Sequence, residues 1–258
     1  MSRREKPLVS VTGGMPRGGE LPPRVVRGID RGLAIQRPVV LAHLRSIARR
    51  HPDYPPAGVL QALERRYLAA VTTGGAAIGA TAVIPGFGTG TTLALAGVET
   101  VAFLEATALF AQSVSELHGI AVSDPDRARV LVMTMMLGRE GSELVRNWAG
   151  QATATGVARS AYWGELVTSS LPRMLVGPLG DRLKSAFLKR FAVKGGAGVV
   201  AKALPFGVGA ALGGAGNHLL ARKVVHSSRL AFGPPPESMP DLDAFVNDRP
   251  SRRRVRAR

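Results

Sequence analysis

The residues of this 258-residue chain that could carry chemistry do not form a complete catalytic or metal-binding pattern. The run from Gly86 to Thr92 looks like a phosphate-binding loop, but it lacks the lysine that would reach the phosphates. Gly207 and Gly209 begin a dinucleotide-binding fingerprint whose third glycine is missing. The chain contains no cysteine, which excludes thiol catalysis and thiolate zinc sites. We therefore expect a protein that is not an enzyme and that holds no cofactor or metal.

The histidines offer little more, because none is paired with a carboxylate at the spacing of metal ligands. His51 and Asp53 lie in a proline-rich turn before a predicted helix, and that position explains them without catalysis. His218 is a candidate ligand or proton carrier, or else a histidine satisfied within a helix interface. The informative features are therefore charge and hydrophobicity.

The formal charge of +16 is distributed unevenly along the chain. Residues 1–66 and 159–233 are strongly basic, whereas residues 67–158 between them are slightly acidic and very apolar. A basic surface attracts polyanions, which means nucleic acid or the anionic face of a bilayer.

The composition divides the chain into three parts. Residues 1–37 read as a disordered basic arm, residues 38–232 as a helical domain, and residues 233–258 as a Pro/Arg-rich tail. Alanine, leucine, valine and glycine dominate the middle part, which predicts an all-α helical bundle. We expect helices over 39–50 and from residue 57, a helix that ends at Gly119, and another that starts at Asp124-Pro125 with its methionines in the core.

The residues that could enter a membrane lie in an uncharged run from Tyr67 to Val98. A spanning helix needs about 20 apolar residues, and residues 67–84 are long enough for one crossing. The turn Pro85-Gly86-Phe87-Gly88-Thr89-Gly90 divides the run into two arms. The sequence therefore predicts a hairpin dipping into one leaflet, a transmembrane helix with a buried partner, or a buried hairpin of a soluble domain.

A second glycine-rich run, over residues 203–221, repeats these features. Gly209, Gly213 and Asn217 are four residues apart, so they share one helix face. We expect this run to form a half-membrane helix that packs with this face on the first hairpin. We expect Asn217 to bond across that interface. The residues expected to serve insertion or helix packing are Gly75, Gly79, Pro85, Gly86, Gly88, Gly90, Pro205, Gly209, Gly213 and Asn217.

A basic amphipathic stretch lies between the two runs. Leu179, Leu183 and Phe187 recur every four residues, and cations occupy the polar side. This pattern is typical of a helix at an anionic membrane surface, and equally of an ordinary surface helix with a solvated basic face. The residues expected to contact anionic lipid are Arg182, Lys184, Lys189, Arg190 and Lys194.

The end of the helical part carries an ordered set of motifs. Lys202-Ala203-Leu204-Pro205 is followed by Gly209, Gly213-Gly214 and Asn217, then by basic residues and Ala231-Phe232. This order resembles the closing motif of the EcsC family, and the Pro85-Gly86-Phe87-Gly88 hairpin is similar in kind. The resemblance covers roughly residues 57–232. It implies a helical, glycine-rich bacterial protein of undefined role, first noted beside an ABC transporter, and no catalytic residues.

These observations predict a non-enzymatic helical protein on the cytoplasmic face of the bacterial cytoplasmic membrane, accessory to a transporter or envelope machine. Its expected partners are anionic lipids together with a membrane protein or further copies of itself. Two alternatives remain open: a soluble helical carrier of an apolar ligand, and non-specific nucleic-acid binding through the Arg-rich ends.

Overall fold

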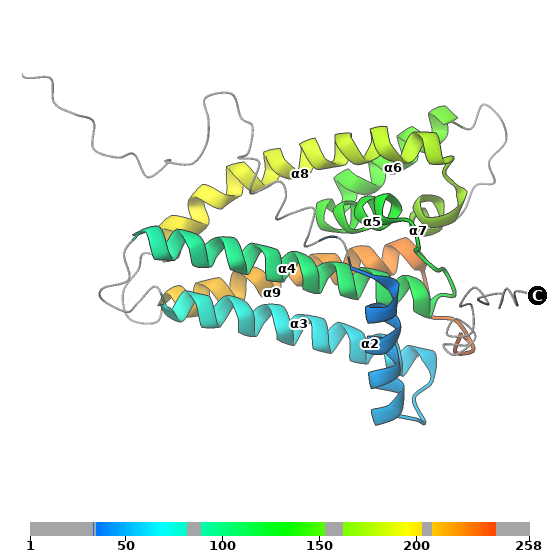
Figure 1. Cartoon of the computed structure of the whole chain (residues 1–258), viewed down its shortest axis with the longest axis horizontal. Coiled ribbons are helices and arrows are strands. Elements are labelled where there is room, and N and C mark those ends of the chain that lie inside the picture. The colour runs from blue at the N-terminus through cyan, green and yellow to red at the C-terminus, as the bar shows by residue number, and fades with distance from the viewer. Residues whose placement is uncertain (1–32, 34, 82–88, 153–161, 203–207, 241–258) are drawn as a thin grey trace, which may run out of the picture.

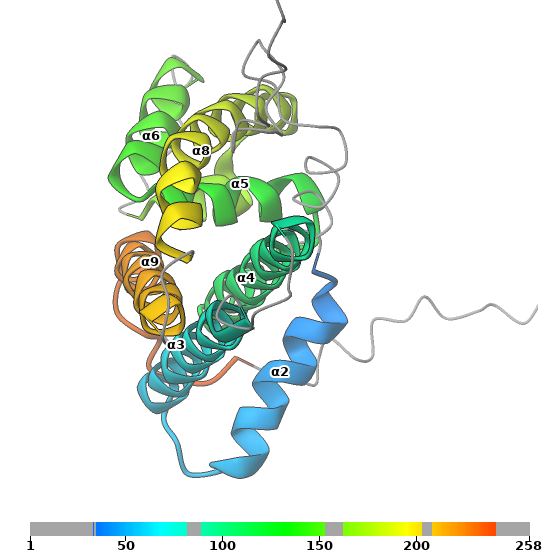
Figure 2. The same ribbon diagram turned by 90° about the vertical axis from the view of Figure 1, so that its left-hand side faces the viewer.

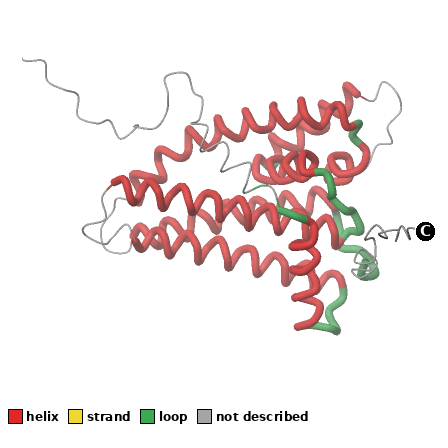
Figure 3. The backbone as a smooth tube through the Cα atoms, viewed as in Figure 1, coloured by secondary structure: helices red, strands yellow, loops and turns green. Residues whose placement is uncertain are grey.

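The computed structural model describes residues 33, 35–81, 89–152, 162–202 and 208–240. For residues 78–81, 89–98, 151–152, 188–202 and 208–213 it describes the backbone alone. All regular structure within these ranges is helical (Figure 3), which confirms the predicted all-α class.

The helices begin and end close to the predicted residues. The segments expected over 39–50 and from residue 57 are α2 and α3. Residues 85–88 of the expected turn lie outside the described residues, whereas Thr89 and Gly90, expected in that turn, form the start of α4. In chain order the elements are α2 (Arg37–Arg50), α3 (Pro56–Thr81), α4 (Thr89–Leu117), α5 (Pro125–Leu137), α6 (Arg139–Ala152), α7 (Trp163–Glu165), the π-helical turn η2 (Leu166–Ser170), α8 (Arg173–Lys202) and α9 (Val208–Phe232).

The long helices form two layers (Figure 1). One layer holds α3, α4 and α9, with α3 in its most extensive contact with α9 and its next with α4. The other layer holds α5, α6 and α8, while α2 packs across α3 and α4 (Figure 2). Because α3 runs antiparallel to both α4 and α9, the end of α3 and the starts of α4 and α9 lie at the same end of the molecule.

The hydrophobic core is centred on the second half of α4, where every residue from Phe110 to Leu117 is buried. Met133 and Met135 of α5 are completely enclosed, as expected for core methionines. Helix α4 ends where predicted, just before Gly119. Gly119 adopts a left-handed φ of 75° that other residues rarely adopt, and this conformation ends the helix. A helix buried on all sides must be covered by several others, and this explains the two-layer arrangement.

The beginning of the uncharged run belongs to this core, which corrects the expectation that all of residues 67–84 faces a membrane. Tyr67 is 4% exposed, and its ring stacks on Phe110 with 4.6 Å between ring centroids. Its hydroxyl bonds to Thr107 Oγ1 at 2.8 Å. Leu33 is also buried, although it falls within the arm that was expected to be disordered.

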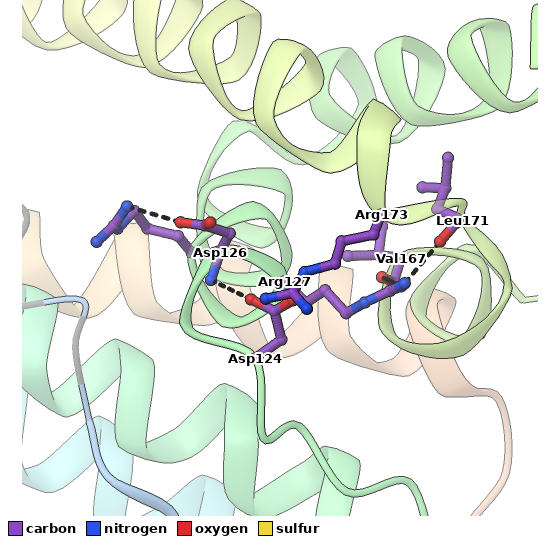
Figure 4. Close-up of polar contacts among 7 residues, drawn as sticks. Asp124, Asp126, Arg127, Val167, Leu171 and Arg173 are labelled. Atoms are coloured by element: carbon purple, nitrogen blue, oxygen red, sulfur yellow. Dashed lines mark hydrogen bonds and ion pairs between the residues drawn. The ribbon is translucent and has the colours of Figure 1, made fainter.

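Polar contacts at the start of α5 fix the turn that leads into α8 (Figure 4). The Asp124 carboxylate accepts a hydrogen bond from the Asp126 backbone N–H at 2.9 Å, which caps α5 as its sequence predicted. The guanidinium of Arg127 donates to the carbonyl oxygens of Val167 and Leu171 at 2.8 and 2.6 Å. These carbonyls lie in and just after η2, so one side chain ties α5 to the entry of α8.

His43 of α2 makes the stability of the fold depend on pH. Burial lowers its pKa, and the positive charge of Arg66 lowers it further. The folded state therefore binds the proton less readily than the unfolded state, so His43 costs stability as the pH falls below about 6.5. We expect His43→Gln to lose less stability than the wild type between pH 7.5 and about 5.5 in urea unfolding. Equal losses in both proteins would contradict the assignment.

Candidate membrane-inserting tip

Three helix ends without any charged residue meet at one end of the molecule. They are residues 73–81 of α3, 89–98 of α4 and 208–216 of α9, and we call them together the tip. Figure 1 shows these ends side by side at the left, and Figure 2 looks onto them. The first charge of α4 is Glu99, and the first of α9 is Arg222. Tertiary structure thus gathers the uncharged parts of two separate runs into one unit.

The tip has the length of one leaflet. At about 1.5 Å per residue, each of its helical segments extends about 13–15 Å. The hydrocarbon core of a bilayer is about 30 Å thick, so this length matches about half of it. Among the described residues, no helix combines the length and the hydrophobicity that a full crossing requires. The transmembrane helix expected over residues 67–84 is therefore unsupported.

A layer of polar side chains marks the inner boundary of the tip. Asn217 of α9 donates from Nδ2 to Glu99 Oε1 of α4 at 3.1 Å and to the carbonyl oxygen of Val71 in α3 at 3.3 Å. The cross-helix bond expected of Asn217 is thus present. Glu99 is 7% exposed, as expected for a carboxylate that faces protein. One amide therefore links all three helices of the tip at the level where charge first appears.

Thr72 and His218 extend this boundary between α3 and α9. Thr72 Oγ1 donates to the Leu68 carbonyl at 2.6 Å and lies 3.0 Å from His218 Nδ1. Because the hydroxyl has one proton and gives it to Leu68, Nδ1 of His218 must donate to Thr72. His218 is therefore held within the interface, and we call Thr72, Glu99, Asn217 and His218 the polar layer.

Small residues allow α3 and α9 to approach closely just beyond the polar layer. A Cβ added to Gly214 would lie 3.3 Å from both the Cβ of Ala76 and the Thr72 carbonyl oxygen. Gly75 of the same α3 face is buried. The close contact described is thus at Gly214, next to the predicted Gly213. Gly79, Gly90, Gly209 and Gly213 lie within helices whose surroundings are not described there, while Pro85, Gly86, Gly88 and Pro205 lie outside the described residues.

At the opposite end of the α3–α9 contact, an ion pair replaces the small residues. Arg229 donates from Nε and Nη2 to the two carboxylate oxygens of Glu64 at 2.8 and 2.6 Å. The hydrogen bonds and the charge of Glu64 raise the pKa of Arg229. No pattern in the sequence predicts this ion pair, because Glu64 and Arg229 are distant in the chain. The Arg229–Glu64 ion pair and the uncharged tip thus lie at opposite ends of the α3–α9 pair.

The basic stretch of α8 uses its apolar stripe inside the protein. Leu179, Leu183 and Phe187 are buried in the core, so this stripe is not available to lipid. Arg182 lies over the Trp148 ring with 4.5 Å from its guanidinium carbon to the ring centroid. Lys184 is half-buried. These two predicted lipid contacts therefore lie beside protein groups.

The C-terminal part of α8 carries the remaining predicted lipid contacts. Lys189, Arg190 and Lys194 belong to this part, whose side chains are not described. Its backbone runs toward the start of α9 (Figures 1 and 2), and α8 contacts α9. The cations of this segment thus belong to the helix end that reaches the tip.

The histidine and carboxylate candidates do not assemble into a metal site. The part of the chain that the structure describes contains no group of three or more His, Asp or Glu side chains placed to hold a metal ion. His51 stacks on Tyr54 at 4.3 Å between ring centroids, consistent with its predicted role in a turn.

Comparison with known proteins identifies no relative of the chain, so its class is defined by its fold alone. No protein-family model, curated protein or solved structure matches it. The chain is an all-α protein of two helical layers, and its similarity to the EcsC family stays a prediction.

Removing the Asn217 amide tests the polar layer. We expect Asn217→Ala to lower the free energy of unfolding by about 1–3 kcal/mol, because Glu99 and the Val71 carbonyl lose a donor at a site with little access to water. Urea unfolding measures the change. As a control, Ser185→Ala replaces an exposed polar residue of α8 and is expected to change stability by less than about 0.5 kcal/mol. Equal stability of the two variants would show that the polar layer contributes nothing.

Proposed function

We propose that this chain is a non-enzymatic helical protein that binds the cytoplasmic face of an anionic bacterial membrane and inserts its tip into one leaflet. The observation that carries the proposal is the meeting of three uncharged helix ends at one end of an otherwise basic protein. This arrangement supports the hairpin dipping into one leaflet, and it requires no helix to cross the bilayer.

The charge distribution supports the same orientation. The tip has no charged residue of its own, and the segment of α8 that reaches it carries Lys189, Arg190 and Lys194. Cations at this level would lie among anionic headgroups while the tip enters the hydrocarbon, and each contributes about 1 kcal/mol near such a surface. Basic flanks also favour the cytoplasmic side. By its resemblance to the EcsC family, we propose a role beside a transporter or envelope machine.

A fluorescent label tests the proposal directly, because the chain has no cysteine and a single engineered one is labelled uniquely. Ala77 and Ala57 are both exposed on α3, Ala77 in the tip and Ala57 at the other end of the helix. We attach an environment-sensitive dye to Ala77→Cys or to Ala57→Cys and add vesicles of phosphatidylglycerol that carry nitroxide-labelled acyl chains.

The proposal requires that the dye at residue 77 shift to the blue and be quenched, while the dye at residue 57 does neither. Binding should also survive high salt and alkaline carbonate. If the protein floats with the vesicles but the dye at residue 77 is not quenched, the protein binds by electrostatic attraction only, and insertion of the tip is overturned. No flotation, with salt-sensitive binding to DNA of any sequence, would replace the proposal by nucleic-acid binding.

A further inference from the structure

Helix α9 exposes large aliphatic side chains directly behind the polar layer. Leu219, Leu220 and Leu230 are 61%, 42% and 57% exposed, although the opposite side of the helix is packed into the core through Val224 and Phe232. Leu219 follows Asn217 by two residues, so this exposed surface starts where the tip ends. Several large aliphatic side chains exposed along one helix indicate a surface that is covered when the protein functions.

The charged residues that α9 places beside these leucines are positive. Arg222 and Lys223 are exposed, as is the neighbouring His226, and α9 contains no acidic residue. At about 100° per residue, Arg222, Leu219, His226, Leu230 and Lys223 fall within an arc of about 100° around the helix axis. Leu220 borders this arc on one side. We call this surface the α9 outer face.

The chemistry of the α9 outer face fits an anionic bilayer surface. Aliphatic side chains flanked by Lys and Arg are the pattern of helices that lie in the membrane interface, with their apolar groups near the acyl chains and their cations on phosphates. Figure 2 shows α9 at the edge of its layer. Because the leucines are exposed, none of the described helices covers this side of α9. The surface is also continuous along one helix with residues 208–216 of the tip.

We propose that the α9 outer face lies on the same anionic membrane into which the tip inserts, so that the bound protein is tilted and α9 meets the bilayer at a shallow angle. This inference rests on the proposed function and adds the orientation of the bound molecule. It assigns lipid contact to Leu219, Leu230, Arg222 and Lys223, beyond the segment of α8 that the sequence indicated.

Replacing the two most exposed leucines tests the orientation. Leu219→Ser/Leu230→Ser is expected to weaken binding to phosphatidylglycerol vesicles about tenfold, because two aliphatic side chains no longer enter the interface. The matched control is Val39→Ser/Met174→Ser, which removes two exposed apolar side chains, 51% and 81% exposed, from α2 and α8. The control is expected to bind like the wild type. Thermal unfolding should show that both variants retain the fold.

Labels separate failure of this inference from failure of the proposed function. A dye on His226→Cys should be quenched by nitroxide lipids together with the dye on Ala77→Cys. Quenching at residue 77 but not at residue 226, with unchanged affinity of the leucine variant, would overturn the tilt and leave tip insertion standing. Quenching at neither position would overturn both. Unchanged vesicle affinity of the leucine variant combined with binding of an acidic amphipathic peptide would assign this face to a protein partner.

Discussion

Two carboxylates placed on the tip are expected to weaken binding to anionic vesicles by about two orders of magnitude. Gly74 and Ala77 are exposed on α3 beyond the polar layer, and a Cβ at Gly74 meets no other atom within 4 Å. Gly74→Glu/Ala77→Glu should therefore fold normally in water. In the membrane each carboxylate would enter the leaflet at a cost of about 1.5 kcal/mol, roughly half the cost at the bilayer centre.

The matched control carries the same added charge outside the tip. Ala57 and Gln61 are exposed on the first turns of α3, so Ala57→Glu/Gln61→Glu lowers the net charge equally without reaching the leaflet. Flotation with phosphatidylglycerol vesicles measures both affinities. We expect only a small loss for the control. Equal losses in the two variants would show that net charge alone governs binding and that the tip stays in water.

A disulfide across the tip is expected to raise the free energy of unfolding by up to about 5 kcal/mol, since it closes a loop of about 140 residues. The Cβ built on Gly214 lies 3.3 Å from the Cβ of Ala76, close to the separation within a disulfide. Because the chain has no cysteine of its own, Ala76→Cys/Gly214→Cys has only this pair to form. The melting temperature with and without reductant measures the gain, expected to be about 10–15 °C.

A neighbouring pair controls for the geometry of this disulfide. Ala77 follows Ala76 in α3, but its side chain is rotated by about 100° around the helix axis and is exposed. Ala77→Cys/Gly214→Cys is therefore expected to stay reduced under the same mild oxidation. Disulfide formation in both variants, or a melting temperature that reductant does not change, would contradict the close contact of α3 with α9 in the tip.

The sequence alone predicted the features that depend on neighbours in the chain. The capped start of α5 at Asp124 and the end of α4 before Gly119 are local, because a few adjacent residues decide where a helix begins and ends. The all-α class follows from composition and periodicity in the same way. The absence of charge over two separate runs is also a property of the sequence, and it indicated the segments that later proved to form the tip.

Tertiary structure decided which surfaces those segments present. The stripes of Leu179 and Leu183 in α8 and of Leu219 and Leu230 in α9 are both apolar, yet the first is buried and the second is exposed. Periodicity states that a face is apolar but not what covers it, because the cover comes from a helix distant in the sequence. For the same reason the sequence predicted a cross-helix bond of Asn217 but not its partner Glu99, because the two residues meet only when α9 packs on α4.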